Sequence, residues 1–182
     1  MSSYSPDEIL TFWFAPENRP RWFTPDSAFD AEIARRFGPL IEDAADGRLA
    51  AWVREPRGAL ALCILLDQFP RNVWRGTPRA FAYDRYALPV AEEALARGHD
   101  RALSPEERLF LYLPLEHSED LERQQRCVAL MEGLGDPGWL DYAVRHRDIV
   151  ARFGRFPHRN AVLGRTSTAE EEAFLQEPNA SF

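Results

Sequence analysis

Apolar residues recur every three to four positions along most of the chain, which is the spacing of one face of an α-helix. The clearest pattern lies at 138–153, where one stripe is apolar and contains His146, while the opposite stripe is charged. No segment alternates convincingly between apolar and polar residues with period two. The pattern therefore predicts an all-α protein without strands.

Helix-start signals divide this pattern into elements. Ser5, Ser104 and Thr168 are each followed three positions later by Glu, which is the spacing of a capping box. We expect Pro70 to stop the helix that contains the apolar run 59–66. The pattern predicts about eight helices, at 6–14, 27–46, 57–68, 84–97, 105–113, 119–133, 138–153 and 168–175.

Two of the predicted helix pairs, 84–115 and 119–150, resemble each other. The pattern Ala-Leu-x-x-Gly that ends at Gly98 recurs at Gly133, an offset of 35 residues. This offset is close to the period of tetratricopeptide repeats, which are antiparallel helical hairpins. A length of 182 residues and a hydrophobic content of 45% further predict a single domain, 1–182, with a sizeable core.

Charge and hydropathy narrow the possible partners and the location. A net charge of −7 argues against nucleic acid as a partner, because nucleic-acid binding relies on an excess of cations. The longest apolar run has eight residues, too few to span a membrane. The N-terminus lacks the basic and apolar regions of a signal peptide. We therefore expect a cytoplasmic protein without a membrane partner, and the sequence does not indicate its oligomeric state.

Every one of the 22 basic residues is an arginine, and lysine is absent. Schiff-base catalysis and a phosphate-binding loop with its lysine are therefore excluded. Cys63 and Cys127 have no partner at metal-ligand spacing, and we interpret both as buried, inert thiols. No His-rich metal motif occurs either. The sequence predicts no cofactor and no metal site.

Three polar segments interrupt the helical pattern: 67–72, 116–120, and 152–160 with its continuation at 165–168. Residues 147–165 sum to a charge of +4, which leaves −11 for the rest of the chain. Arginines in such a loop can converge on a phosphate or carboxylate ligand, and His158 adds a donor. The alternative is that the same arginines bridge to acids such as Asp67, Glu116, Glu119 or Asp120 and tie helix ends together.

Two histidines near these segments are candidates for different roles. His117 precedes two carboxylates, one of which can orient it as a general base. Ser118, with Glu119 and Asp120 after it, is typical of a helix N-cap and first turn. His146, on the apolar stripe of 138–153, is better interpreted as a core histidine than as a ligand.

Taken together, the polar segments resemble the bacterial family known as domain of unknown function 924. The motifs are Leu66-Asp67-Gln68-Phe69-Pro70-Arg71-Asn72, Pro114-Leu115-Glu116-His117-Ser118-Glu119-Asp120 and Phe153-Gly154-Arg155-Phe156-Pro157-His158-Arg159-Asn160. The resemblance runs from about Ile9 to Leu175. It implies an all-α fold similar to tetratricopeptide-repeat proteins, and it implies no established activity or catalytic residue.

Three functional hypotheses follow from the sequence. The first is a binding module for an anionic small molecule or an acidic peptide. Its candidate ligand-binding residues are Asp67, Arg71, His117, Glu119, Asp120, Arg155, His158, Arg159 and Asn160. The second is a hydrolase or lyase with His117 or His158 as general base and arginines that stabilise an anionic intermediate. The third is a structural module whose motifs lock the helices and whose function lies in a protein–protein surface.

Overall fold

The computed structural model describes residues 4–178, 180 and 181, so residues 1–3, 179 and 182 of the predicted domain lie outside the described residues. Within the described ranges the secondary structure is helical and contains no strand, which confirms the all-α prediction. Internal contacts divide the chain into two compact units. The first contains the chain up to Arg75 and Arg79–Pro114, and the second contains Gly76–Pro78 and the chain from Leu115 onward.

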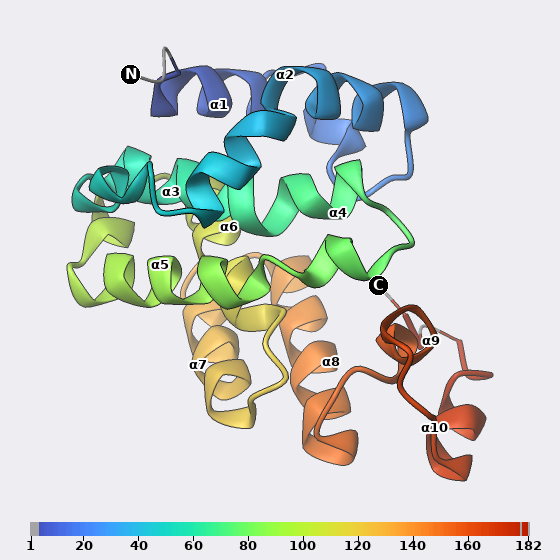
Figure 1. The fold of residues 1–182 in the computed structure, drawn as a ribbon. Helices are drawn as coiled ribbons and strands as arrows, with labels where there is room; N and C mark the ends of the chain where they lie inside the picture. The colour runs from blue at the N-terminus through green and yellow to red at the C-terminus, as the bar shows by residue number, and fades with distance from the viewer. Residues whose placement is uncertain (1–3, 179, 182) are drawn as a thin grey trace. The chain divides into compact units, whose positions relative to one another are not determined.

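The first unit is built from helices in layers (Figure 1). The middle helical segment, α3 to α4, packs against α1 and α2 on one side and against α5 on the other. The elements of this unit are α1 (Pro6–Trp13), η1 (Arg19–Arg21), α2 (Ser27–Ala45), η2 (Ala50–Arg54), α3 (Pro56–Cys63), η3 (Ile64–Gln68), α4 (Phe69–Val73), η4 (Pro78–Phe81), α5 (Asp84–Ala96), η5 (His99–Ala102) and α6 (Pro105–Glu116). Two of these elements cross the division: Pro78, the first residue of η4, and the last two residues of α6 belong to the second unit.

The prediction that Pro70 stops a helix is wrong. Helix α3 continues through the π-helical turn η3 into α4, and Pro70 is the second residue of α4. In regular α geometry the proline ring clashes with the carbonyl four residues earlier. Just before Pro70 the turn is wider, because Phe69 N–H donates to the carbonyl of Ile64, five residues earlier. The hydrogen-bond register of the helix is therefore shifted where the proline ring would otherwise clash. The helical segment therefore continues to Val73.

The core of the first unit is aromatic. Trp13, Phe29, Phe37, Phe69 and Phe110 are almost completely buried. The Phe37 and Phe69 rings stack at 5.1 Å between centroids, and Trp13 meets Phe110 edge-on at 5.4 Å. These rings come from α1, α2, α4 and α6, so their packing fixes the helices of this unit against one another.

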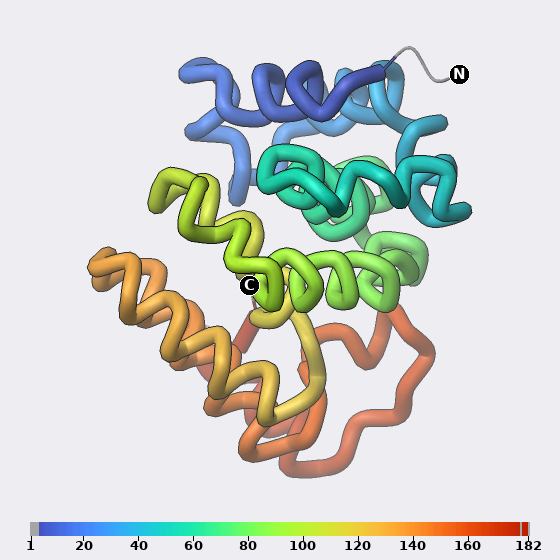
Figure 2. The backbone as a smooth tube through the Cα atoms, turned by 90° about the vertical axis from the view of Figure 1, so that its left-hand side faces the viewer, coloured from blue at the N-terminus to red at the C-terminus, as the bar shows by residue number. Residues whose placement is uncertain are grey.

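The second unit contains a helical hairpin followed by shorter elements (Figures 1 and 2). Helices α7 (Leu121–Glu132) and α8 (Pro137–Phe153) pack side by side and are joined by a turn in which Gly135 has a φ of 75°. This backbone conformation favours glycine. The chain then forms η6 (Pro157–Arg159), α9 (Asn160–Leu163) and α10 (Ala169–Phe174).

The apolar stripe of α8 lies largely as predicted. Ala143, His146, Ile149 and Val150 are buried, whereas Tyr142 is 51% exposed. Ile149 and Val150 pack with Phe156, Phe174 and Ala180 in a core of this unit. Across the described part of the chain, none of the helices combines the length and the apolar character that a membrane crossing requires.

Candidate functional site

The loop after α8 places Arg155 against the start of α10. Its Nε and Nη2 atoms donate to the two carboxylate oxygens of Glu171 over 2.6 and 2.7 Å. Glu171 also accepts the backbone N–H of Thr168 within the capping box that begins α10. The hydrogen bond from Arg155, together with that from Thr168, lowers the pKa of Glu171 to about 2. The ionised carboxylate therefore occupies the fork of Arg155.

Arg165 forms a second pair of the same kind with Glu119. Arg165 Nη1 and Nη2 donate to the two Glu119 oxygens over 2.7 and 2.9 Å, and the backbone N–H of Phe156 donates to the same carboxylate over 2.8 Å. Burial raises the pKa of Glu119, but the hydrogen bonds from Arg165 and Phe156 outweigh it, so the pKa lies below its usual range. This pair connects the segment before α7 to the loop after α9.

Arg159, the last residue of η6, and Asn160, the first residue of α9, are buried and bind neighbouring groups. Asn160 accepts a hydrogen bond from Arg165 Nε over 2.9 Å and donates to Ser167 Oγ over 3.0 Å. Arg159 is 7% exposed, and its Nη1 donates to the His117 carbonyl over 3.1 Å. The guanidinium also lies over the Phe156 ring, 4.5 Å from its centroid. Both side chains therefore connect parts of the second unit.

These contacts bear on the hypothesis of an anion-binding loop. The forks of Arg155 and Arg165 each bind a carboxylate of the same unit, and Arg152 binds Glu170 over 2.9 Å. This arrangement agrees with the alternative in which the arginines tie helix ends together. Glu119 is one of the acids expected in that role, whereas Glu171 is not among them.

Asp67 and Arg71 lie in the first unit, whereas the other candidate residues lie in the second. Arg71 Nη1 and Nη2 donate to the two Asp84 oxygens over 2.7 and 3.0 Å, at the first residue of α5. Arg71 Nη1 also lies 3.3 Å from Asp67 Oδ1, and Asp67 is fully buried in η3. Gln68 Nε2 donates to Asp67 over 2.6 Å. The group connects the π-helical turn to α5.

Helix α7 begins two residues later than the sequence predicts. Its N-cap is Asp120, whose carboxylate accepts the backbone N–H of Arg123 over 3.0 Å. The prediction of Ser118 as the N-cap is therefore wrong, because the carboxylate of Asp120 takes this role. Glu119 consequently lies outside the first turn, where it binds Arg165.

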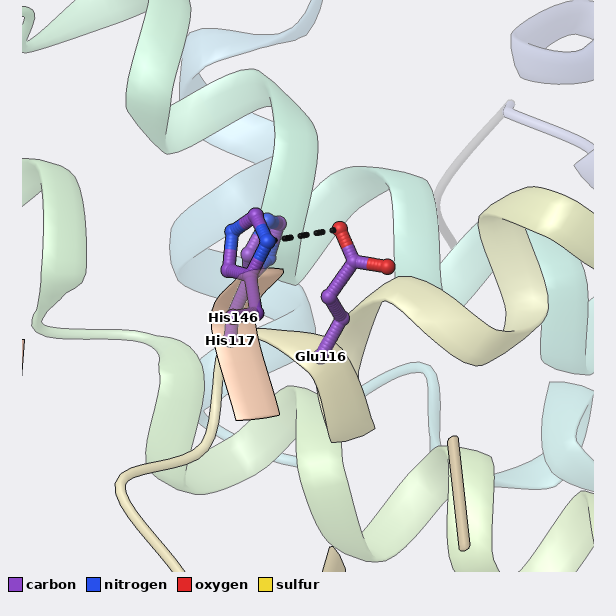
Figure 3. A group of neighbouring side chains, drawn as sticks. All are labelled: Glu116, His117 and His146. Atoms are coloured by element: carbon purple, nitrogen blue, oxygen red, sulfur yellow. Dashed lines mark ion pairs between the residues drawn. The ribbon is translucent and has the colours of Figure 1, made fainter. Parts of the chain in front are cut away.

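The histidines gather with Glu116 in the second unit. Glu116 is the last residue of α6, His117 follows it, and His146 comes from the buried stripe of α8. One ligand atom from each of these three side chains lies within 4.8 Å of the other two. Figure 3 shows the Glu116 carboxylate directed toward the imidazoles, with Glu116 Oε1 3.5 Å from His146 Nδ1. We call Glu116, His117 and His146 the His–Glu cluster.

The main chain of the cluster is held by side chains from other elements. Gln124 of α7 donates to the Glu116 and Ser118 carbonyls over 2.6 and 2.7 Å, and Arg159 donates to the His117 carbonyl. The carbonyl of Glu116, the last residue of α6, and those of the two residues after it thus have side-chain partners. The Cys127 thiol lies 4.0 Å from Glu116 Oε2 and donates to it. The backbone that carries Glu116 and His117 is therefore held in place by hydrogen bonds from other elements.

The surroundings keep two histidines neutral. Burial, with repulsion from His117, lowers the pKa of His146 to about 3. Burial and the positive charge of Arg159 lower the pKa of His158 to about 4. Both imidazoles are therefore unprotonated at neutral pH. His146 Nδ1 lies 2.8 Å from the Tyr142 carbonyl, which fixes the ring orientation.

A family profile described as a bacterial protein of unknown function, DUF924, matches residues 9–179. The chain belongs to this family. The match confirms the resemblance found in the sequence motifs, and it contains the whole His–Glu cluster. No curated protein matches the chain.

A solved structure also resembles the chain closely. It is described as a protein of unknown function, ATU0120, from Agrobacterium tumefaciens. The two chains are 44% identical, the TM-score is 0.89, and the alignment covers 95% of this chain and 97% of the other. The helical architecture described above is therefore shared with another protein of known structure.

The sequence indicates His117 as a candidate and allows His117, His146 and His158 to meet in space, but no spacing supports that meeting. It indicates Glu116 only as a possible partner for arginines, and it favours His146 as a core residue over a ligand. The signal was present in two parts, a Glu-His pair at a helix end and a histidine on an apolar stripe. Only the packing of α8 in the second unit brings these parts together.

Proposed function

We propose that the second unit carries a hydrolytic site at the His–Glu cluster. The observation behind this proposal is the spacing of at most 4.8 Å between ligand atoms of Glu116, His117 and His146. Three atoms at that spacing can all contact one water oxygen at about 2.8 Å, a normal hydrogen-bond length. The cluster is thus suited to orienting a water molecule for attack.

The three side chains take different roles in this proposal. His117 is partly exposed and acts as the general base, taking a proton from the attacking water. Glu116 orients the imidazoles and stabilises the cation that forms when His117 is protonated. His146, with a pKa of about 3, is too weak a base at neutral pH and positions the water instead.

The proposed reaction is the hydrolysis of an ester or phosphoester. The water oxygen forms the new bond to carbonyl carbon or phosphorus, the bond to the leaving oxygen breaks, and His117 returns its proton to that oxygen. The charge of Arg159 lowers the pKa of both His146 and His158, so it acts at the cluster. A nearby cation favours the negative charge that develops on the reacting group.

His158 is a weaker candidate for the base. Its pKa of about 4 makes it a poor proton acceptor at neutral pH. The binding of an anionic small molecule or acidic peptide by the arginines is also less well supported, because Arg155 and Arg165 bind carboxylates within the unit. A tetratricopeptide-like protein–protein surface remains a third proposal, supported by the hairpin of α7 and α8.

The test is a screen of acyl esters and phosphoesters with purified protein, followed by His117→Gln. We expect at least one substrate whose turnover falls 100-fold or more, about the contribution of a general base. The matched control is His99→Gln, because His99 lies in the first unit and contacts the Val53 carbonyl. Turnover that is absent throughout, or equal in wild type and His117→Gln, would refute the hydrolase.

A further inference from the structure

We propose that Glu116, His117 and His146 bind a divalent transition-metal ion, with zinc as the best-matched candidate. The inference uses the site of the proposed hydrolase. When the ion is bound it would supply the activation of water that His117 provides without it, because an imidazole nitrogen that coordinates a metal no longer accepts a proton. It departs from the sequence-based expectation of no metal site. Metal binding is measured without substrate, so it succeeds or fails separately from hydrolysis.

The donor set supports zinc. Two imidazoles and one carboxylate are a set that holds catalytic zinc while leaving a fourth position for water. Neutral imidazole also suits copper, nickel and cobalt, whereas calcium and magnesium prefer sites made of oxygen atoms. A cluster with two nitrogen donors and one carboxylate therefore favours a transition metal over an alkaline-earth ion.

The spacing supports the same conclusion. Zinc bonds of 2.0–2.1 Å in a tetrahedron place ligand atoms about 3.3 Å apart. One ligand atom from each of the three side chains lies within 4.8 Å of the other two, so the donors stand up to about 1.5 Å wider apart than in a zinc tetrahedron. Closing the remaining distance takes a side-chain rotation, and His117 is partly exposed and follows the last residue of α6.

Contacts around the cluster resemble the outer shell of a metal site. Metal-binding histidines commonly donate their second ring nitrogen to a backbone carbonyl. His146 Nδ1 lies 2.8 Å from the Tyr142 carbonyl, and a proton on Nδ1 places the lone pair of the neutral ring on Nε2. The Cys127 thiol bonds Glu116, while Gln124 holds the carbonyls on either side of His117. The ligands are thus supported from α7 and α8.

The binding test uses zinc and cobalt ions with chelator-treated, full-length protein. We expect wild type to bind one zinc ion per chain in competition with a chromophoric chelator. We also expect bound Co²⁺ to give the visible absorption bands of a four-coordinate site. His117→Ala and Glu116→Gln should each weaken zinc binding at least tenfold, whereas His99→Ala should bind as wild type does.

Thermal unfolding of every variant without metal keeps this test decisive. Because His117 is partly exposed, we expect His117→Ala to fold and to lose the zinc-induced rise in Tm. Zinc affinity that is the same in His117→Ala, Glu116→Gln and wild type would overturn the metal site, and so would wild type that binds no zinc. Zinc binding without any turnover would leave the metal site standing and remove the hydrolase. Turnover by chelator-treated protein that binds no zinc would remove the metal site and leave the hydrolase standing.

Discussion

Two polar regions of the second unit differ in how their charges are matched. In the arginine pairs, each guanidinium meets one carboxylate through two hydrogen bonds, as Arg165 does with Glu119 and Arg155 with Glu171. In the His–Glu cluster, two imidazoles face one carboxylate, and at least one of them is held neutral by burial. The first arrangement pairs permanent charges, and the second gathers groups that exchange protons or bind metals.

We propose that this difference separates groups that stabilise the fold from groups that carry chemistry. Arginine stays charged at every accessible pH, so a paired guanidinium contributes orientation and stability. Imidazole changes its charge near neutral pH and is a common metal ligand. We therefore expect substitutions in the arginine pairs to act on stability and substitutions at His117 to act on function.

The largest expected loss of stability is that of Glu119→Ala. This variant leaves Arg165 and the Phe156 N–H without their carboxylate inside the second unit. We expect the free energy of unfolding to fall by about 2–3 kcal/mol, less than for a fully buried pair because both side chains keep some exposure. Urea denaturation measures the loss. Glu132→Ala, at an exposed position of α7, is the control and should change stability by about 0.5 kcal/mol or less.

An intermediate effect on the free energy of unfolding is expected when the pH is lowered. The folded pKa of Glu171 is lowered to about 2 from the model-compound value of 4.5, so its contribution to stability is complete above about pH 4.5. Below that pH the unfolded chain binds the proton first, and the contribution is lost as the pH falls toward 2. Urea unfolding at a series of pH values should therefore show a shallower acid decline in Glu171→Gln than in wild type. Identical slopes would contradict the assigned role of this pair.

A smaller effect is expected from Arg155→Lys. Lysine keeps the positive charge but lacks the planar fork that binds both oxygens of Glu171. We expect a lower Tm than wild type, with a decrease smaller than that of Glu119→Ala. If Tm is unchanged, the two-pronged geometry of this pair adds nothing to the charge alone.

Much of the helical architecture follows from local sequence signals. The capping boxes at Ser5, Ser104 and Thr168 mark the starts of α1, α6 and α10, as predicted. The rule that proline stops a helix gave a wrong prediction at one position, because the turn before that proline is not a regular α-helical turn. Pro70 continues a helix because a π-helical turn precedes it.

The candidate site was less predictable than the helices. His117 stands out in the sequence as a histidine beside acids, but the side chains that gather around it in the fold are those of Glu116 and His146. His146 is 29 positions away, and no local spacing rule connects the two histidines. In the same way, Arg165 and Glu119 form an ion pair although they are 46 positions apart in the sequence. Contacts of this length depend on tertiary packing, which a single sequence does not display.

The most direct test of the distinction between stabilising arginine pairs and a functional His117 is a measurement on His117→Ala. The quantity measured is its free energy of unfolding at pH 7 without added metal. Because His117 is partly exposed and its carbonyl contact to Arg159 survives the substitution, we expect a value within about 0.5 kcal/mol of wild type. That result would place His117 outside the structural network. A loss of about 2 kcal/mol or more, similar to that of Glu119→Ala, would show that His117 stabilises the fold as the arginine pairs do and would contradict the distinction.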